Sequence, residues 1–140
     1  MDIEIVSTDE AIAACYPVMR ELRPHIGEQD FLARVRAQQA AAYRLACLRA
    51  EGAPVAVAGF RISENLAWGR HLYVDDLVTL TDRRSKGYGA ALLAWLRAHA
   101  VEHGCRQLHL DSGLQREAAH RFYEREGMTK GGFHFVEIIQ

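Results

Sequence analysis

The sequence predicts an α/β (α+β) fold, a mixed central sheet of about six to seven strands flanked by about four helices. Short stretches in which apolar residues dominate or alternate are typical of strands, and longer stretches with apolar residues three or four apart are typical of helices. The two kinds of stretch follow each other in mixed order. The length of 140 residues suits one core. No linker, repeat or biased segment interrupts it, so we expect a single domain over residues 1–140.

The first 42 or so residues predict one strand and two helices. Acidic and apolar residues alternate over Asp2–Ile5, which is typical of a strand. The polar stretch Ser7–Glu10 offers an N-cap and an acidic first turn for a helix that should run to about Leu22. Pro17 lies inside that helix and should kink it, because proline removes a backbone donor. A second helix is expected at about 28–41.

The remaining residues, about 43–139, predict five strands and two helices. The expected strands are Tyr43–Leu48, Val55–Ile62, His71–Leu80, Leu108–Leu110 and Phe133–Ile139. The expected helices run from Gly87 to Gly104 and from Glu117 to Glu126. Glycine follows each of these helices, at 104 and 127, and favours the left-handed conformation that ends a helix.

Net charge and cysteine usage exclude several classes of protein. Seventeen Lys and Arg residues stand against eighteen Asp and Glu, a formal net charge of −1, which excludes a generally basic nucleic-acid binder. The first residues lack the basic and apolar regions of a signal peptide, and no apolar run reaches the roughly 20 residues of a membrane span. Cys15, Cys47 and Cys105 form no C-x-x-C pair and favour reduced, buried thiols. We therefore expect a cytoplasmic protein with no nucleic-acid or membrane partner.

Seven histidines raise the question of a metal site. They are scattered, and only His99 and His103 have the i, i+4 spacing. This pair lacks the glutamate directly after the first histidine that an H-E-x-x-H motif needs. Cationic side chains near the C-terminal end of a helix are favourable to its dipole. We therefore predict no metal, and stoichiometric zinc in the purified protein would contradict this.

The segment at residues 78–93 combines a strand, a polar loop and a helix that opens with glycines. Gly87 and Gly89 let the backbone approach a ligand closely, at a helix end whose N–H groups have no partner. Three basic residues add positive charge there: Arg83, Arg84 and Lys86. This arrangement predicts an anion site. The segment has no G-x-x-x-x-G-K-[ST] motif, and Leu92 takes the place of the third small residue in the dinucleotide fingerprint.

The R-x-x-G-x-G pattern at Arg84–Gly89, soon after a strand, resembles motif A of the GNAT superfamily of acyl-CoA-dependent N-acyltransferases. Residues 120–128, H-R-F-Y-E-R-E-G-M, resemble the closing helix of that family, and the spacing between the two motifs also matches. The resemblance covers about residues 43–139, while residues 1–42 match by element order. Two residues depart from the family pattern: Arg116 stands where an Asn is common, and Met128 replaces Phe.

The resemblance implies that acetyl-CoA is the acyl donor and that the glycine turn holds its pyrophosphate through backbone N–H groups. It also implies that the end of the preceding strand contacts the acetyl-pantetheine end. The implied acetyl-CoA-binding residues are Leu77, Val78, Thr79, Arg84, Ser85, Lys86, Gly87, Tyr88, Gly89 and Ala90.

Three residues are candidates for catalysis. Tyr123 matches the family's usual general acid, and its structural alternative is an aromatic anchor for the helix. Asp75 and Asp76 are adjacent in an apolar strand, where they should point to opposite faces and where an unpaired charge is costly. The resemblance favours Asp75 as the base, acting directly or through water, with Asp76 orienting a neighbour or pairing with an arginine. Two alternatives stay open: both aspartates in structural salt bridges, or Asp111 as the base.

The resemblance implies an N-acetyltransferase that moves the acetyl group to a primary amine by direct attack in a ternary complex. A small-molecule amine is favoured, because the nearly neutral chain shows no acidic patch for a basic polypeptide, and the closing helix resembles the subset that acetylates aminoalkylphosphonates. A protein or peptide N-acetyltransferase and a non-catalytic acyl-CoA-binding regulatory module are the alternatives. Acceptor contacts are expected from Arg20–Phe31 and Ser63–Arg70; Arg23, His25 and Arg70 could meet an anionic group. A homodimer formed through Phe133–Ile139 stays open.

Overall fold

The computed structural model describes residues 2–140. The chain forms two compact units, an N-terminal unit that ends at His109 and a C-terminal unit of Leu110–Gln140. Each is described by itself, and the expectation of a single domain over residues 1–140 stays a prediction. None of the helices in the described part of the chain is long and apolar enough to cross a membrane.

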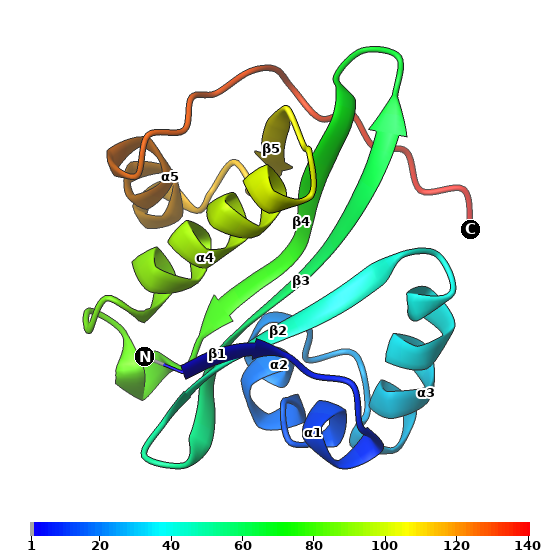
Figure 1. Cartoon of the computed structure of the whole chain (residues 1–140), viewed down its shortest axis with the longest axis vertical. Helices are drawn as coiled ribbons and strands as arrows, with labels where there is room; N and C mark the ends of the chain where they lie inside the picture. The colour runs from blue at the N-terminus through cyan, green and yellow to red at the C-terminus, as the bar shows by residue number, and fades with distance from the viewer. Residues whose placement is uncertain (1) are drawn as a thin grey trace. The chain divides into compact units, whose positions relative to one another are not determined.

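The N-terminal unit is built on a sheet with strand order β1-β2-β3-β4-β5 (Figure 1). Strands β1 to β4 pair as consecutive antiparallel neighbours. The strands are β1 (Asp2–Ile5), β2 (Tyr43–Ala50), β3 (Ala53–Asn65), β4 (Gly69–Thr79) and β5 (Gln107–Leu110). The long β3–β4 hairpin extends beyond the predicted apolar stretches, because backbone pairing continues into the polar residues on both sides of its turn.

Helices cover both faces of this sheet. The helices are α1 (Asp9–Ala13), α2 (Tyr16–Leu22), α3 (Glu28–Gln39) and α4 (Tyr88–Glu102). Val57 of β3 packs into one core with residues of α1, α2 and α3, whereas Phe60 contacts Trp95 of α4, with ring centroids 6.1 Å apart. Side chains three residues apart in a strand point to opposite faces, so α1–α3 and α4 lie on opposite sides of β3.

The first predicted helix was wrong as a single element, because the chain forms α1 and α2 in its place. Thr8 caps α1, its Oγ1 accepting from the backbone N–H of Ala11 at 3.1 Å. Pro17 lies in the first turn of α2. At that position the missing N–H removes no helical hydrogen bond, so proline starts a helix here and kinks none.

The C-terminal unit contains α5 (Glu117–Arg125), which matches the predicted closing helix. Gly127 has φ +97°, and the N–H of Met128 donates to the Tyr123 carbonyl at 3.0 Å. This is the glycine-dependent end that the sequence predicts. The predicted strand Phe133–Ile139 is wrong: residues 128–140 carry no strand. An alternating sequence forms a strand only where a neighbouring strand accepts its hydrogen bonds.

The α+β class is as predicted, with five strands in place of six to seven and five α-helices in place of about four among residues 2–140. A short 3-10 helix, η1 (Thr81–Arg83), lies between β4 and α4. Cys15, Cys47 and Cys105 are all free. Cys15 and Cys47 are buried, as expected, whereas Cys105 is only half-buried.

A β-bulge in β4 decides where its two aspartates point. Gly59 of β3 opposes Asp76, but the next residue, Phe60, opposes Val74, so Asp75 is the extra residue. The prediction that adjacent Asp75 and Asp76 face opposite sides is therefore wrong. Both residues line one cavity on the α2–α3 side of the sheet.

Replacing Gly59 by alanine should destabilise the protein. A Cβ at this position would overlap the Tyr43 hydroxyl and crowd the Asp76 carboxylate, so a buried contact would have to shift. We expect the free energy of unfolding, measured by urea denaturation, to fall by about 2 kcal/mol or more. Gly131→Ala, where no atom lies near the added Cβ, is the control and should change it by less than about 0.5 kcal/mol. Equal stabilities of the two variants would contradict this view of the bulge.

Candidate active site

A cavity of about 430 Å³ lies in the N-terminal unit, lined by residues of α2, α3, β3 and β4 and of the loops that follow α2 and α3. Its lining residues are Met19, Arg23, His25, Ile26, Phe31, Arg34, Val35, Gln38, Ala41, Arg61, Asp75 and Asp76. The volume suits a small molecule. Two of the three predicted catalytic residues thus share one concave site.

Asp75 is held by a two-point ion pair. Arg61 of β3 donates from Nε to Asp75 Oδ2 at 2.7 Å and from its terminal nitrogen to Oδ1 at 2.8 Å. These hydrogen bonds raise the pKa of the Arg61 guanidinium above its usual range. The Asp75 side chain keeps 28% of its surface exposed, so water and ligands can reach the carboxylate.

Asp76 is held more tightly, by two side chains from different elements. Tyr43 of β2 donates its hydroxyl to Asp76 Oδ2 at 2.7 Å, and Nε of Arg23 donates to Oδ1 at 2.9 Å. Arg23 also donates to the Asp75 carbonyl at 2.9 Å. Only 13% of the Asp76 side chain is exposed. Asp76 thus pairs with an arginine, as one predicted alternative states, and anchors the loop after α2 to β4. Both aspartates form ion pairs, which the sequence analysis left open as the structural alternative.

Burial, and then the negative charge of Asp76, raise the pKa of Tyr43 well above its usual range. Tyr43 is 3% exposed. Its hydroxyl therefore keeps its proton at neutral pH and serves as a fixed donor to Asp76.

The glycine turn ahead of α4 has the conformation of an anion site. Ser85 and Gly87 adopt positive φ values of 66° and 82°, and the first helical hydrogen bond runs from Ala91 N to Gly87 O at 3.0 Å. No side chain caps the helix. The N–H groups of the first helical residues, Tyr88, Gly89 and Ala90, therefore have no acceptor within the helix.

The three basic side chains of the turn differ in whether they are already paired with an acidic residue. Arg83 lies 3.5 Å from Glu51, whereas Arg84 and Lys86 are exposed and form no ion pair among the described residues. Leu77, Val78 and Thr79 end β4, paired with Ala58, Val57 and Ala56 of β3. The predicted acetyl-CoA-binding residues thus follow one path, from the end of β4 through the turn into α4.

Tyr123 and Asp111 belong to the C-terminal unit. Burial raises the pKa of Tyr123, with the charge of Arg116 acting in the opposite direction, so the phenol keeps its proton at neutral pH, as a general acid must. The Asp111 carboxylate lies 3.3 Å from Nδ1 of His134, and both side chains are largely exposed.

The two predicted acceptor segments differ in what they contribute. Arg23 and His25 of the first line the cavity, but no residue of Ser63–Arg70 does. Trp68 stacks on His109 with ring centroids 3.5 Å apart, and Arg70 lines a different cavity, of about 320 Å³.

Arg34, Tyr43 and Arg61 were missed as site residues. The arginine at 61 interrupts an otherwise apolar stretch, a signal that could have identified it.

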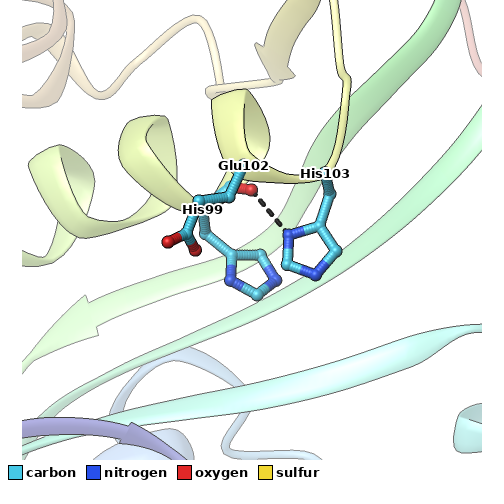
Figure 2. A group of neighbouring side chains, drawn as sticks. All are labelled: His99, Glu102 and His103. Carbon is cyan, nitrogen blue, oxygen red and sulfur yellow. Dashed lines mark hydrogen bonds between the residues drawn. The ribbon is translucent and has the colours of Figure 1, made fainter.

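His99 and His103 lie together with Glu102 on the last turn of α4, with one ligand atom of each within 4.8 Å of the others (Figure 2). His103 Nδ1 lies 2.9 Å from the His99 carbonyl oxygen. Burial, and then the charge of His103, lower the pKa of His99. Arg44 and Arg70 line the same cavity as the two histidines, and their positive charge opposes a dication. The absence of a metal stays a prediction.

A sequence profile of the Acetyltransferase (GNAT) family matches residues 6–128. The chain belongs to the GNAT family. A GNAT relative of nearly equal length, the uncharacterized N-acetyltransferase YhdJ of Bacillus subtilis (strain 168), is 37% identical over 136 residues, 96% of each chain. The aminoalkylphosphonate N-acetyltransferase of Salmonella typhimurium is 35% identical over 66 residues, 47% of this chain and 43% of that protein.

Solved structures agree with the GNAT assignment. A putative acetyltransferase from Agrobacterium tumefaciens has a TM-score of 0.82 and 26% identity, with 98% of this chain and 100% of that chain covered. AAC(6')-Iy, in complex with a bisubstrate analogue of coenzyme A and acetylneamine, has a TM-score of 0.87 and 15% identity, with 99% and 97% covered. The second likeness shows the fold alone. The resemblance read from the two sequence motifs is confirmed, and the protein is an acyltransferase.

Replacing Tyr43 by Phe should make stability less sensitive to alkaline pH. Above about pH 10 the unfolded chain releases the phenol proton, while the raised pKa keeps it on Tyr43 in the folded protein. The unfolded state then binds fewer protons, so this group lowers the free energy of unfolding by up to about 1.4 kcal/mol per pH unit. We expect urea denaturation between about pH 9 and pH 11 to show that the free energy of unfolding falls less steeply with pH for the variant than for the wild type. Identical slopes would contradict the raised pKa.

Proposed function

We propose that this GNAT protein is a cytoplasmic enzyme that transfers the acetyl group of acetyl-CoA to the primary amine of a small molecule, by direct attack in a ternary complex. One observation carries the proposal: Asp75 and Asp76 face a small cavity from the strand whose end leads into the uncapped glycine turn. The proposed acceptor site and the proposed donor site would thus be adjacent along β4.

The glycine turn suits the pyrophosphate of acetyl-CoA. The free N–H groups of Tyr88, Gly89 and Ala90 and the unpaired charges of Arg84 and Lys86 are complementary to a polyanion. The backbone of Leu77–Thr79 would contact the acetyl-pantetheine end. Acetyl-CoA supplies a thioester carbonyl and a thiolate leaving group.

Asp75 acts as the general base, directly or through one water. It accepts a proton from the acceptor ammonium, and the free amine nitrogen then attacks the thioester carbonyl. The C–N bond forms as the C–S bond breaks, and the amine gives up its second proton. The Arg61 pair fixes the carboxylate orientation. Asp76, bonded to Tyr43 and Arg23, holds β2 and the end of α2 in place beside the cavity.

Tyr123 acts as the general acid. Its raised pKa keeps the phenol protonated at neutral pH, so it can donate to the departing thiolate and be reprotonated by the second amine proton. The balance is one ammonium and one thioester converted to one amide, one thiol and one released proton.

A small acceptor is favoured over a peptide by the size of the cavity, about 430 Å³. The name of the Salmonella relative points the same way, since aminoalkylphosphonates are small amines. A non-catalytic acyl-CoA-binding module would need neither paired aspartates at a cavity nor a half-buried tyrosine.

Replacing Gly87 or Gly89 by valine should abolish coenzyme A binding. Gly87 has a left-handed backbone that a β-branched residue adopts only under strain, and a side chain at either position would stand between the backbone and the phosphates. We expect isothermal titration calorimetry to show no saturable binding, while circular dichroism shows an intact fold. Gly132→Val, in an open part of the tail, is the control and should bind normally. Normal affinity in the Gly87 and Gly89 variants would refute the assignment of the turn.

Thiol release from acetyl-CoA across a set of small amines and peptides tests the activity itself. We expect turnover with small amines, and Asp75→Asn and Tyr123→Phe should each lower it at least about tenfold, because each removes a proton-transfer group. Glu10→Gln, an exposed carboxyl on α1, is the matched control and should leave turnover unchanged.

Unchanged turnover in either variant would remove that residue from the mechanism. Turnover with peptides alone would favour the protein acetyltransferase, and tight acetyl-CoA binding without any turnover would favour the regulatory module.

A further inference from the structure

The cavity beside Asp75 and Asp76 carries an excess of positive charge. Three guanidinium groups, those of Arg23, Arg34 and Arg61, line it against the two carboxylates. His25 lines the same cavity. A ligand that brings a negative charge would balance this site.

Only one of the three arginines is available to a ligand. Arg61 is engaged by Asp75 and Arg23 by Asp76, both at hydrogen-bond distance. Arg34 is exposed, and its side chain makes no hydrogen bond or ion pair within residues 2–140. A free guanidinium at a concave site suits an oxyanion, because two of its N–H groups can match a carboxylate or phosphonate in parallel hydrogen bonds.

The opposed charges lie on different elements of the cavity. The carboxylates come from β4, whereas Arg34 comes from α3 with Gln38 one helical turn further along, on the same face. Buried apolar side chains complete the lining: Met19, Phe31 and Val35. The cavity therefore has one side where carboxylates and arginines are paired, an opposite side with a free guanidinium, and an apolar lining, which together fit a short aliphatic chain with opposite charges at its ends.

We propose that the acceptor is a small zwitterion, a primary amine that carries a carboxylate or phosphonate group, and that Arg34 binds this anionic group while the amine lies toward Asp75. The proposal rests on the proposed function of the same site. Arg34 then also excludes competitors, since a diamine or a lysine-rich peptide would bring a second positive charge against it.

Amines that differ only in the anionic group provide the test. The anionic members are β-alanine and 2-aminoethylphosphonate, and the matched amines without a negative charge are propylamine, ethanolamine and 1,3-diaminopropane. We expect kcat/KM for thiol release to be at least about tenfold higher for the anionic members, as a charge-assisted bidentate contact allows. The better of the two anionic members identifies carboxylate or phosphonate as the group recognised.

Variants of Arg34 assign the preference to this residue. Arg34→Ala should raise KM for the anionic amines about tenfold with little change in kcat. For propylamine, KM and kcat should stay within about twofold of the wild-type values. Arg34→Glu should shift the preference toward 1,3-diaminopropane. Arg97→Ala, the loss of an exposed arginine on α4 outside the cavity, is the control for net charge and should keep the wild-type preference.

The outcomes separate the two proposals. Equal or better turnover of propylamine by the wild type, or an unchanged preference in Arg34→Ala, would overturn the inference and leave the proposed function standing. Absence of turnover with every amine, in protein that binds acetyl-CoA by calorimetry, would overturn both.

Discussion

The β-bulge at Asp75 is the constraint on which the candidate active site depends. In a regular strand one of two adjacent aspartates would face α4 and the other the cavity. The bulge turns both toward α2 and α3, and Gly59 opposite leaves the room that the Tyr43 hydroxyl and the Asp76 carboxylate occupy. Partial burial of these charges is tolerable because each carboxylate has an arginine partner, and Asp76 also accepts a hydrogen bond from Tyr43. The fold thereby concentrates titratable groups at one small cavity.

The two carboxylates are held differently, and this suggests different tasks. Asp76 is nearly buried and joined to Tyr43 and Arg23, which links β2 and the end of α2 to β4. Asp75 is paired with one arginine and is more exposed, so a ligand or a water can reach its carboxylate. A net charge of −1 for the whole chain conceals this local organisation. The Asp–Arg pairs line one cavity, and basic residues gather at the turn before α4.

The sequence predicted the element order from residue 43 to residue 126, because strong apolar periodicity and helix-ending glycines mark those elements. It also identified the glycine turn, since the motif lies in consecutive residues. It could not predict the bulge, because an extra residue leaves no mark in the alternation of β4 alone and depends on its pairing with β3. For the same reason the partnership of Arg61 with Asp75 was missed. Pro17 was misjudged because the same residue either kinks a helix or starts one, and here α1 ends at Ala13, so Pro17 falls in the first turn of α2. The tail at Phe133–Ile139 has the pattern of a strand, but pattern alone supplies no pairing partner.

A crystal structure of the protein with coenzyme A and an unreactive analogue of the acceptor amine would test the central claim most directly. The account predicts coenzyme A with its pyrophosphate at the backbone of Gly87–Ala90, and the analogue with its reacting end within hydrogen-bond reach of Asp75, directly or through one water. An acceptor bound elsewhere, such as at Trp68 on the β3–β4 turn, would contradict the account. In that outcome Asp75 would still be paired with Arg61 and would lie far from the acceptor.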